Sequence, residues 1–131
     1  MTSTATPQVP VITCTRAFAG LPQSVAAARA WVAGFVLGSP AADDAALLTS
    51  ELVTNAILYS ASRLPGGLVI VSVRTGDGSV RVDVTDQGEA PPGFAAASGF
   101  GAGLMIVSQL ADVFGRDGHD YWFALRTGGA S

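Results

Sequence analysis

The chain contains no lysine, so its seven basic residues are all arginines, and they are scattered from Arg16 to Arg126 without forming a cluster. Ten acidic residues outnumber them, and the formal net charge is −3. Proteins that bind nucleic acids through the phosphate backbone typically carry a basic patch or stripe. The composition therefore argues against direct binding of DNA or RNA.

Cysteine and long apolar runs are also scarce. Cys14 is the single cysteine, which excludes an intramolecular disulfide framework and a thiolate metal site. No apolar stretch reaches the roughly 18 residues of a membrane-spanning helix, and no N-terminal segment combines basic residues with an apolar run. We therefore expect a cytoplasmic protein with no membrane partner.

What the chain does have is enough apolar sequence for one domain. Of its 131 residues, 49% are hydrophobic and only 13% are charged. A chain of this length buries roughly two-thirds of its unfolded surface when it folds. We expect flexible ends at residues 1–8 and 127–131 around a single domain that spans residues 9–126.

Periodicity and turn residues predict the order of the elements. Strands are expected at 9–18, 68–74, 80–86, 113–116 and 121–126, and helices at 24–37, about 40–60 and about 101–111. Ser39 and Pro40 are expected to open the second helix as N-cap and first helical residue. Residues 87–100 should form a loop. The predicted fold is an α/β (α+β) two-layer sandwich, in which helices cover one face of a mixed β-sheet.

The second predicted helix carries a narrow polar stripe. Glu51 and Asn55 lie one helical turn apart, and their flanks are apolar on both sides, with Leu47 and Leu58 on one and Leu48, Leu52 and Tyr59 on the other. A carboxylate among apolar neighbours is costly unless a cation, a donor or a ligand compensates it. The stripe indicates a binding or catalytic site. The alternative is a structural pair that caps a neighbouring loop.

Two glycine-containing motifs follow the stripe along the chain. The first is Asp86-Gln87-Gly88 at the end of a predicted strand, and the second is the run Gly99-Phe100-Gly101-Ala102-Gly103-Leu104, which opens the last helix. Glycine lets backbone approach a ligand, and the N–H groups at a helix start favour anions such as phosphate. The run does not fit the dinucleotide-binding fingerprint, because it follows a long loop late in the chain. Each motif alone is weak, and the combination is specific.

These residues resemble the ATP-binding domain shared by DNA gyrase, mismatch-repair ATPases and histidine kinases. Within that group the sequence is most similar to the small stand-alone anti-sigma factor serine/threonine kinases of bacteria. The resemblance covers residues 12–126 and implies a histidine-kinase-like ATPase fold. It rests on three motifs, the N-box Ser50-Glu51-Leu52-Val53-Thr54-Asn55-Ala56, the first glycine box Asp86-x-Gly88 and the second glycine box Gly101-x-Gly103-Leu104.

The resemblance implies a role for each motif. Asn55 would coordinate Mg²⁺ through its side-chain oxygen, and Glu51 would act as the general base that takes a proton from a protein serine or threonine hydroxyl. Asp86 would accept a hydrogen bond from the adenine amino group, and Gly88 would leave room for the ring. The second glycine box would present backbone to the ATP phosphates, through Gly101, Ala102, Gly103 and Leu104. One protein ligand to Mg²⁺ is chemically sufficient, because this ion keeps several waters and also binds the phosphates.

The sequence also departs from this family. Tyr59 stands where many relatives carry histidine, Ala102 stands where arginine is frequent, and Asp120 falls near a usual threonine. No basic residue occurs between Asp86 and Ala111, so the phosphate charge has to be offset by Mg²⁺ and backbone N–H groups, or by a partner. We therefore expect nucleotide binding to be weaker or slower than in a typical active kinase.

Three functions are consistent with the sequence. The leading one is an ATP- and Mg²⁺-dependent serine/threonine kinase that phosphorylates an anti-sigma antagonist protein and otherwise holds a sigma factor. The second is a non-catalytic nucleotide-binding module that sequesters its partner, and the third is an interaction domain without nucleotide. The resemblance also implies a possible homodimer. His119, the only histidine, is expected to be a solvent-exposed turn residue, which argues against a histidine autokinase.

Overall fold

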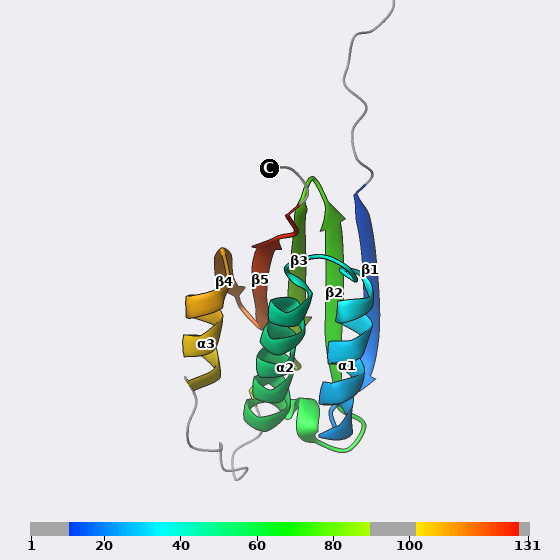
Figure 1. Cartoon of the computed structure of the whole chain (residues 1–131). Coiled ribbons are helices and arrows are strands. Elements are labelled where there is room, and N and C mark those ends of the chain that lie inside the picture. Colours follow the sequence, from blue (N-terminus) through cyan, green and yellow to red (C-terminus); the bar gives the residue numbers. More distant parts are fainter. Residues whose placement is uncertain (1–10, 90–101, 129–131) are drawn as a thin grey trace, which may run out of the picture.

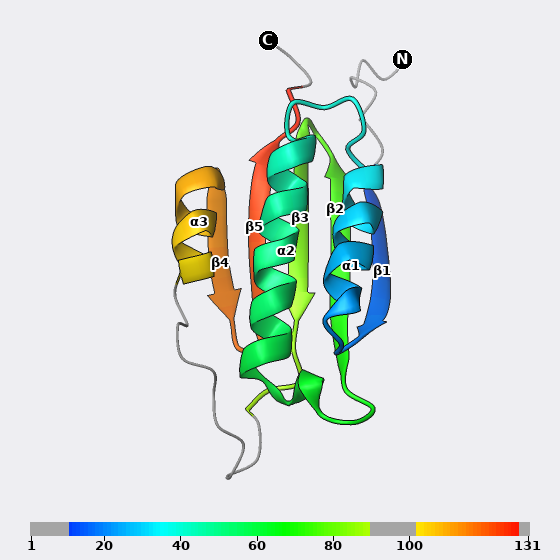
Figure 2. The same cartoon turned by 60° about the horizontal axis from the view of Figure 1, so that its bottom comes forward.

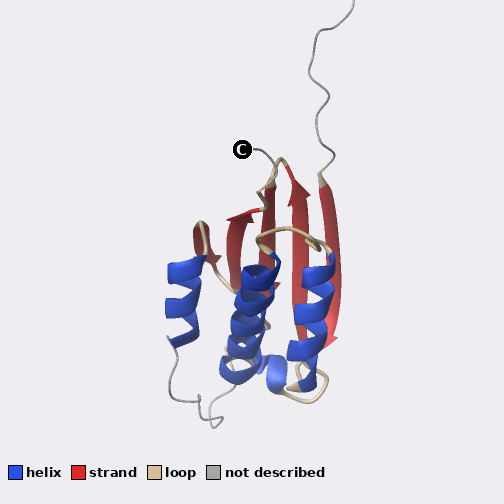
Figure 3. Ribbon diagram, in the orientation of Figure 1, coloured by secondary structure: helices blue, strands red, loops and turns tan. Residues whose placement is uncertain are grey.

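The computed structural model describes residues 11–89 and 102–128, and of residues 102–105 it describes the backbone alone. The α-helices and strands follow one another in the order expected, and all three α-helices lie on the same side of the sheet (Figures 1 and 3). The elements are β1 (Ile12–Ala19), α1 (Gln23–Gly34), α2 (Ala42–Tyr59), the short 3-10 helix η1 (Ala61–Arg63), β2 (Leu68–Gly76), β3 (Ser79–Thr85), α3 (Ala102–Leu110), β4 (Val113–Asp117) and β5 (Asp120–Arg126).

The two-layer α/β sandwich is confirmed, but the expectation of a mixed sheet is wrong. In the described residues the five strands are ordered β1-β2-β3-β5-β4, and every neighbouring pair is antiparallel. The reason lies in the helical connections. Two helices join β1 to β2. The second helix brings the chain back to the end of the sheet where β1 finished, so β2 runs antiparallel to β1. One helix joins β3 to β4, which run the same way, but β5 lies between them (Figure 2).

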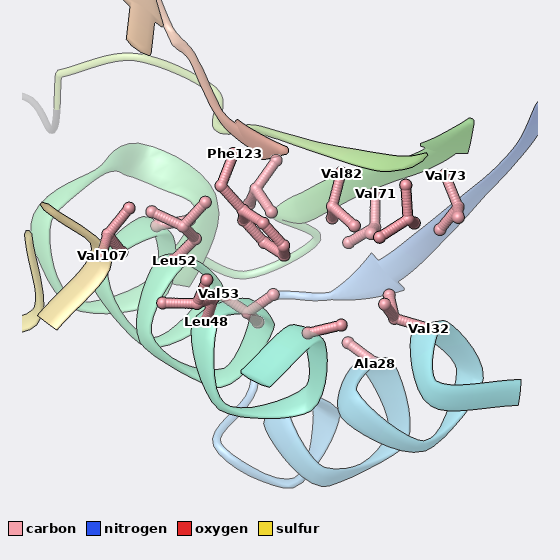
Figure 4. Close-up of a cluster of buried hydrophobic side chains, with 14 of the residues drawn as sticks. Ala28, Val32, Leu48, Leu52, Val53, Val71, Val73, Val82, Val107 and Phe123 are labelled. Atoms are coloured by element: carbon pink, nitrogen blue, oxygen red, sulfur yellow. The ribbon is translucent and has the colours of Figure 1, made fainter. Parts of the chain in front are cut away.

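The core lies between the sheet and the helices. Along β3, Val80, Val82 and Val84 are fully buried on the helix side, while Arg81 and Asp83 face the other way. The same alternation buries Phe123 of β5. Figure 4 shows side chains of the sheet and of all three helices meeting in one cluster. Burial of this apolar surface is the main force that holds α1, α2 and α3 on the sheet.

Helix α2 begins two residues later than expected. Ser39 and Pro40 were expected at the helix start, but the helix begins at Ala42, with Asp43 and Asp44 in its first turn. The Ser39 hydroxyl accepts a hydrogen bond from the Ala41 N–H at 3.0 Å and donates one to the Thr127 carbonyl at 3.0 Å. Ser39 therefore caps the turn before the helix and ties it to the segment after β5.

The end of α2 is held by η1, which the sequence analysis did not predict. The Ser60 backbone is extended, and its hydroxyl accepts a hydrogen bond from the Ser62 N–H at 3.0 Å, which opens the 3-10 turn. Gly20 and Gly67 lie so close to the Ser62 carbonyl oxygen that a Cβ at either glycine would come within 1.7 Å or 2.0 Å of it. These contacts fix the end of α2 against the ends of β1 and β2.

The same turn brings the end of β3 to α2. The Ser62 hydroxyl accepts a hydrogen bond from the Gln87 N–H at 3.0 Å, and the Gly88 carbonyl accepts one from the Ala61 N–H at 2.8 Å. The first glycine box, Asp86-x-Gly88, is thus joined by hydrogen bonds to the turn that follows α2. No helix in the described part of the chain is long and apolar enough to cross a membrane.

Candidate functional site

The polar stripe predicted for the second helix lies in the C-terminal half of α2, at the end of the molecule where β3 also ends (Figure 1). Asn55 is half-buried, and its Nδ2 atom is buried without a hydrogen-bond partner among the described residues. A buried amide nitrogen without a partner loses the free energy of its hydration, by about 1–3 kcal/mol. An unpaired polar atom of this kind calls for an explanation, and a bound ligand or ion is one of them.

Glu51 lies one turn before Asn55 and is also half-buried, not fully enclosed. Within the described residues no hydrogen bond or ion pair engages its carboxylate. The two apolar flanks of the stripe are in different environments. Leu48 and Leu52 are in the core, whereas Leu47 and Leu58 are 41% and 40% exposed. The stripe therefore follows the border between core and surface, where a carboxylate can meet a ligand from solvent.

Asp86 follows β3 directly and is held in a defined orientation. Its Oδ1 atom accepts a hydrogen bond from the Gly88 N–H at 2.8 Å, and its own N–H donates to the His119 carbonyl at 3.0 Å. Gly88 has a φ of +85°, a conformation that residues with a Cβ rarely adopt. The glycine in Asp86-x-Gly88 is therefore required by the turn itself. No hydrogen bond within the described residues engages the second carboxylate oxygen, Oδ2.

The sequence analysis did not place His119 in the candidate site, but the structure brings it beside Asp86. Its side chain is 58% exposed, as expected, but its Nδ1 atom lies 3.6 Å from Oδ1 of Asp86. The imidazole also packs on Gly88, where an added Cβ would meet the ring at 3.3 Å. The alternation of β5 contained the signal: Tyr121 and Phe123 face the helices, and two residues earlier the same face is reached at His119.

Asp120, which the sequence placed near the adenine side of the site, lies on the opposite face of the sheet. It pairs in register with Thr85, whose hydroxyl donates a hydrogen bond to its Oδ1 atom at 3.4 Å. Burial and the neighbouring Asp83 carboxylate raise the pKa of Asp120 to about 7. Asp120 thus belongs to a separate charged cluster and does not touch Asp86.

The second glycine box is only partly within the described residues. Gly101 lies outside them, and α3 begins at Ala102, so Ala102, Gly103 and Leu104 form its first turn. The start of α3 points toward the same end of the molecule as the end of α2 (Figures 1 and 2). The contact of the second glycine box with the ATP phosphates remains a prediction. A helix start at this place favours an anion, because its N–H groups lack partners within the helix.

The residues at this end fit a Mg²⁺ nucleotide in one respect. A carboxamide has one oxygen and one nitrogen at nearly the same positions, and its hydrogen bonds decide which is which. The buried unpaired amide atom of Asn55 therefore accepts either assignment, as an oxygen that binds a cation or as a nitrogen that donates to a phosphate. Within the described residues no group of three or more acidic, histidine or cysteine side chains forms a metal cage of protein ligands.

Comparison with known proteins identifies the class. The chain matches the family described as "Histidine kinase-like ATPase domain" over residues 18–120, and it belongs to that family. It is similar to a protein named "Anti-sigma F factor" from Geobacillus sp. (strain WCH70), with 37% identity over 75 residues. The matched part covers 54% of this chain and 51% of that protein, about half the length of each.

Proposed function

We propose that this chain is an ATP-binding anti-sigma-type regulator that uses ATP and Mg²⁺ to phosphorylate a serine or threonine of an anti-sigma antagonist protein. The observation that carries the proposal is the unpaired amide of Asn55 on the same end of the fold as the oriented carboxylate of Asp86. Membership of an ATPase family and similarity to a protein named as an anti-sigma factor support it.

Each site residue receives one task under this proposal. Asn55 would hold Mg²⁺, which when bound would neutralise phosphate charge and help to align the γ-phosphoryl group. Oδ2 of Asp86 would accept the hydrogen bond of the adenine amino group, because Oδ1 is already engaged by Gly88. The first turn of α3, which contains Ala102, Gly103 and Leu104 and follows Gly101, would direct backbone N–H groups at the phosphates.

Glu51 would accept the proton of the attacking hydroxyl. A general base must be able to reach its substrate, and the half-buried Glu51 carboxylate has no partner within the described residues that would hold it elsewhere. A base mainly orients the nucleophile in phosphoryl transfer, since most of the catalysis comes from positioning and charge neutralisation. The proton would leave the serine or threonine oxygen as the bond to phosphorus forms and the bond to ADP breaks.

A second function is favoured by one feature of the sequence. No basic residue stands between Asp86 and Ala111, so no arginine or lysine of that region can stabilise the charge of a transferring phosphoryl group. A non-catalytic module that binds nucleotide and sequesters a partner needs no such residue. Both functions take the same partners, an antagonist protein or a sigma factor in the cytoplasm, and both are compatible with a homodimer.

The deciding experiment has two stages. Titration calorimetry with ATP, with and without Mg²⁺, tests the site, and we expect Mg²⁺-dependent binding weaker than micromolar. Transfer of labelled γ-phosphate to a candidate antagonist then tests catalysis. Glu51→Ala is expected to keep ATP binding within about twofold and to reduce transfer by about 100-fold or more. Asp43→Asn, an exposed acid on the same helix, is the matched control and should change neither.

Four outcomes are informative. Transfer that requires Glu51 supports the kinase. Mg²⁺-dependent binding without transfer to any antagonist supports the sequestering module. Sub-micromolar affinity for ATP would contradict the expectation drawn from the lack of basic residues. The absence of binding at millimolar ATP would point to a degenerate site that needs its partner, or to an interaction domain without nucleotide.

A further inference from the structure

The carboxylate proposed to recognise adenine has a neighbour whose role neither the family match nor the motifs assign. The His119 imidazole approaches Asp86 through Nδ1 and packs on Gly88 through its Cε1 and Nε2 atoms. His119 sits in the turn between β4 and β5, where Gly118 has a φ of +62°. Its position opposite Asp86 is fixed by the backbone, because the Asp86 N–H donates to the His119 carbonyl.

The contact divides the two oxygens of Asp86 between different tasks. Oδ1 receives the Gly88 N–H at 2.8 Å and faces Nδ1 of His119 at 3.6 Å. That second distance is longer than a hydrogen bond, but such bonds are frequently long before the ligand is present. With the Gly88 N–H bonded to Oδ1 and the imidazole beside the same atom, Oδ2 is the oxygen left for a ligand.

The surroundings make this carboxylate a strong acceptor. The Asp86 side chain is only 12% exposed, so water screens its charge poorly. The Asp86 charge also acts on Tyr121, which lies on the same face of the sheet. Burial is the main cause that raises the pKa of the Tyr121 hydroxyl; the Asp86 carboxylate raises it further, and Arg116 lowers it. Arg116 itself lies over the Tyr121 ring at 4.9 Å, and its Nε donates to the Gly118 carbonyl. His119 thus places a ring nitrogen beside Asp86, where it can donate a hydrogen bond to the carboxylate.

We propose that His119 is a positioning residue for base recognition. It fixes Oδ1 of Asp86 together with the Gly88 N–H, so that Oδ2 accepts the exocyclic amino group of adenine and the site selects 6-amino over 6-oxo purine nucleotides. This inference rests on the proposed function, since it requires ATP to bind at Asp86. With a 6-oxo purine, the acceptor Oδ2 would face the acceptor oxygen at position 6. Two acceptors cannot form a hydrogen bond, so the affinity for such a nucleotide is lower.

The test compares two nucleotides that differ at purine position 6 and in the proton that the 6-oxo form carries on N1. Calorimetry with Mg²⁺-ATP and Mg²⁺-ITP is performed on the wild-type chain, His119→Ala, His119→Asn and the control Asp117→Asn. Asp117 is exposed in the same hairpin. We expect His119→Ala to weaken ATP binding about 10-fold or more, the lower limit for one hydrogen bond to a charged group. ITP affinity should change less than about twofold, so the preference for ATP falls.

His119→Asn should retain most of the preference, because its carboxamide nitrogen can take the place of Nδ1, and a structural role of the ring alone would not show this rescue. The proposal is overturned if His119→Ala keeps the wild-type ratio of ATP to ITP affinity, or if His119→Asn behaves like His119→Ala. A wild-type chain that binds ATP and ITP equally overturns this inference and leaves the proposed function intact. A wild-type chain that binds neither overturns both.

Discussion

The two faces of the sheet handle their polar groups in opposite ways. On the open face, Arg81 of β3 makes two hydrogen bonds to Asp83, at 2.8 Å and 3.0 Å, and its guanidinium stacks on the Trp122 ring, 4.1 Å from its centre. On the helix-covered side, Asn55 and Glu51 have no such partners within the described residues.

The difference teaches where to look for function. Charged groups that satisfy one another stabilise a surface and need nothing further. Burial alone would raise the pKa of Asp83, but hydrogen bonds from Arg81 and Asp120 lower it below its usual value. Polar groups at a border of the core that remain without partners cost stability, so a ligand is the simplest reason to keep them. The charged cluster of the open face is therefore structural, and the sparse set at the end of α2 is the candidate site.

The largest predicted difference between the two faces is in the free energy of unfolding, and two adjacent residues of β5 test it. Phe123 is fully buried under the helices, whereas Trp122 lies half-buried on the open face. Phe123→Ala is expected to lower the free energy of unfolding by about 3–5 kcal/mol. Trp122→Ala should cost about 1–2 kcal/mol, mostly the stacking on Arg81 and partial burial. Denaturant unfolding measures both, and equal losses would show that the open face is as buried in solution as the core.

The second prediction concerns the unpaired amide. Asn55→Ala should reduce Mg²⁺-dependent ATP affinity about 100-fold or more, equivalent to about 2.7 kcal/mol, because a ligand to the metal is lost. The free energy of unfolding should change by less than about 1 kcal/mol, since Nδ2 has no bond to lose within the described residues. Calorimetry and denaturant unfolding give the two values. A large loss of stability with retained ATP binding would make Asn55 structural.

The third prediction tests the packing of the open face. A Cβ on Gly115 of β4 would lie 2.7 Å from the Trp122 ring, so Gly115→Ala should destabilise the chain by about 1–3 kcal/mol through overpacking. In a chain that already carries Trp122→Ala the same substitution should cost less than about 0.5 kcal/mol, because the clash is gone. Additive effects of the two substitutions in unfolding experiments would rule out the contact as the cause.

The smallest effect should depend on pH. The pKa of Asp120 is about 7 in the folded chain, raised by burial and by Asp83, and about 3.9 when unfolded. The folded state therefore binds the proton more tightly, and the stability that this group contributes is lost as pH rises from about 4 to about 7. Asp120→Asn should be more stable than wild type at pH 8, by about 1 kcal/mol after solvent screening, and equal to it near pH 4. Thermal unfolding across that range measures the difference, and a constant gap would refute the raised pKa of Asp120.

The elements of this fold were readable from the sequence because their patterns are strong. The valines of β3 alternate with polar residues, and α2 carries apolar residues at helical spacing around Glu51 and Asn55. The family match supports the fold that the motifs implied. Local pattern therefore predicted which segments are strands and helices, and the positions of the two site residues on α2.

What could not be predicted depends on contacts between distant segments. The order of strands places β5 between β3 and β4, and no local pattern encodes that choice. Whether His119 or Asp120 faces Asp86 depends on a register shift of one residue, which moves a side chain to the opposite face. The Ser62 carbonyl of the 3-10 turn η1 packs against Gly20 and Gly67, a contact between three separate parts of the chain.

The position of β5 has a consequence for how the protein is made. Strands β1, β2 and β3 are neighbours and can pair as soon as they are synthesised, but the strand that covers the free edge of β3 is the last one to leave the ribosome. Phe123, the largest fully buried side chain among the described residues, arrives with it. Until then the nascent chain exposes an unpaired strand edge and an incomplete core, the two features that favour aggregation. The final residues of the domain thus decide when the whole fold can close.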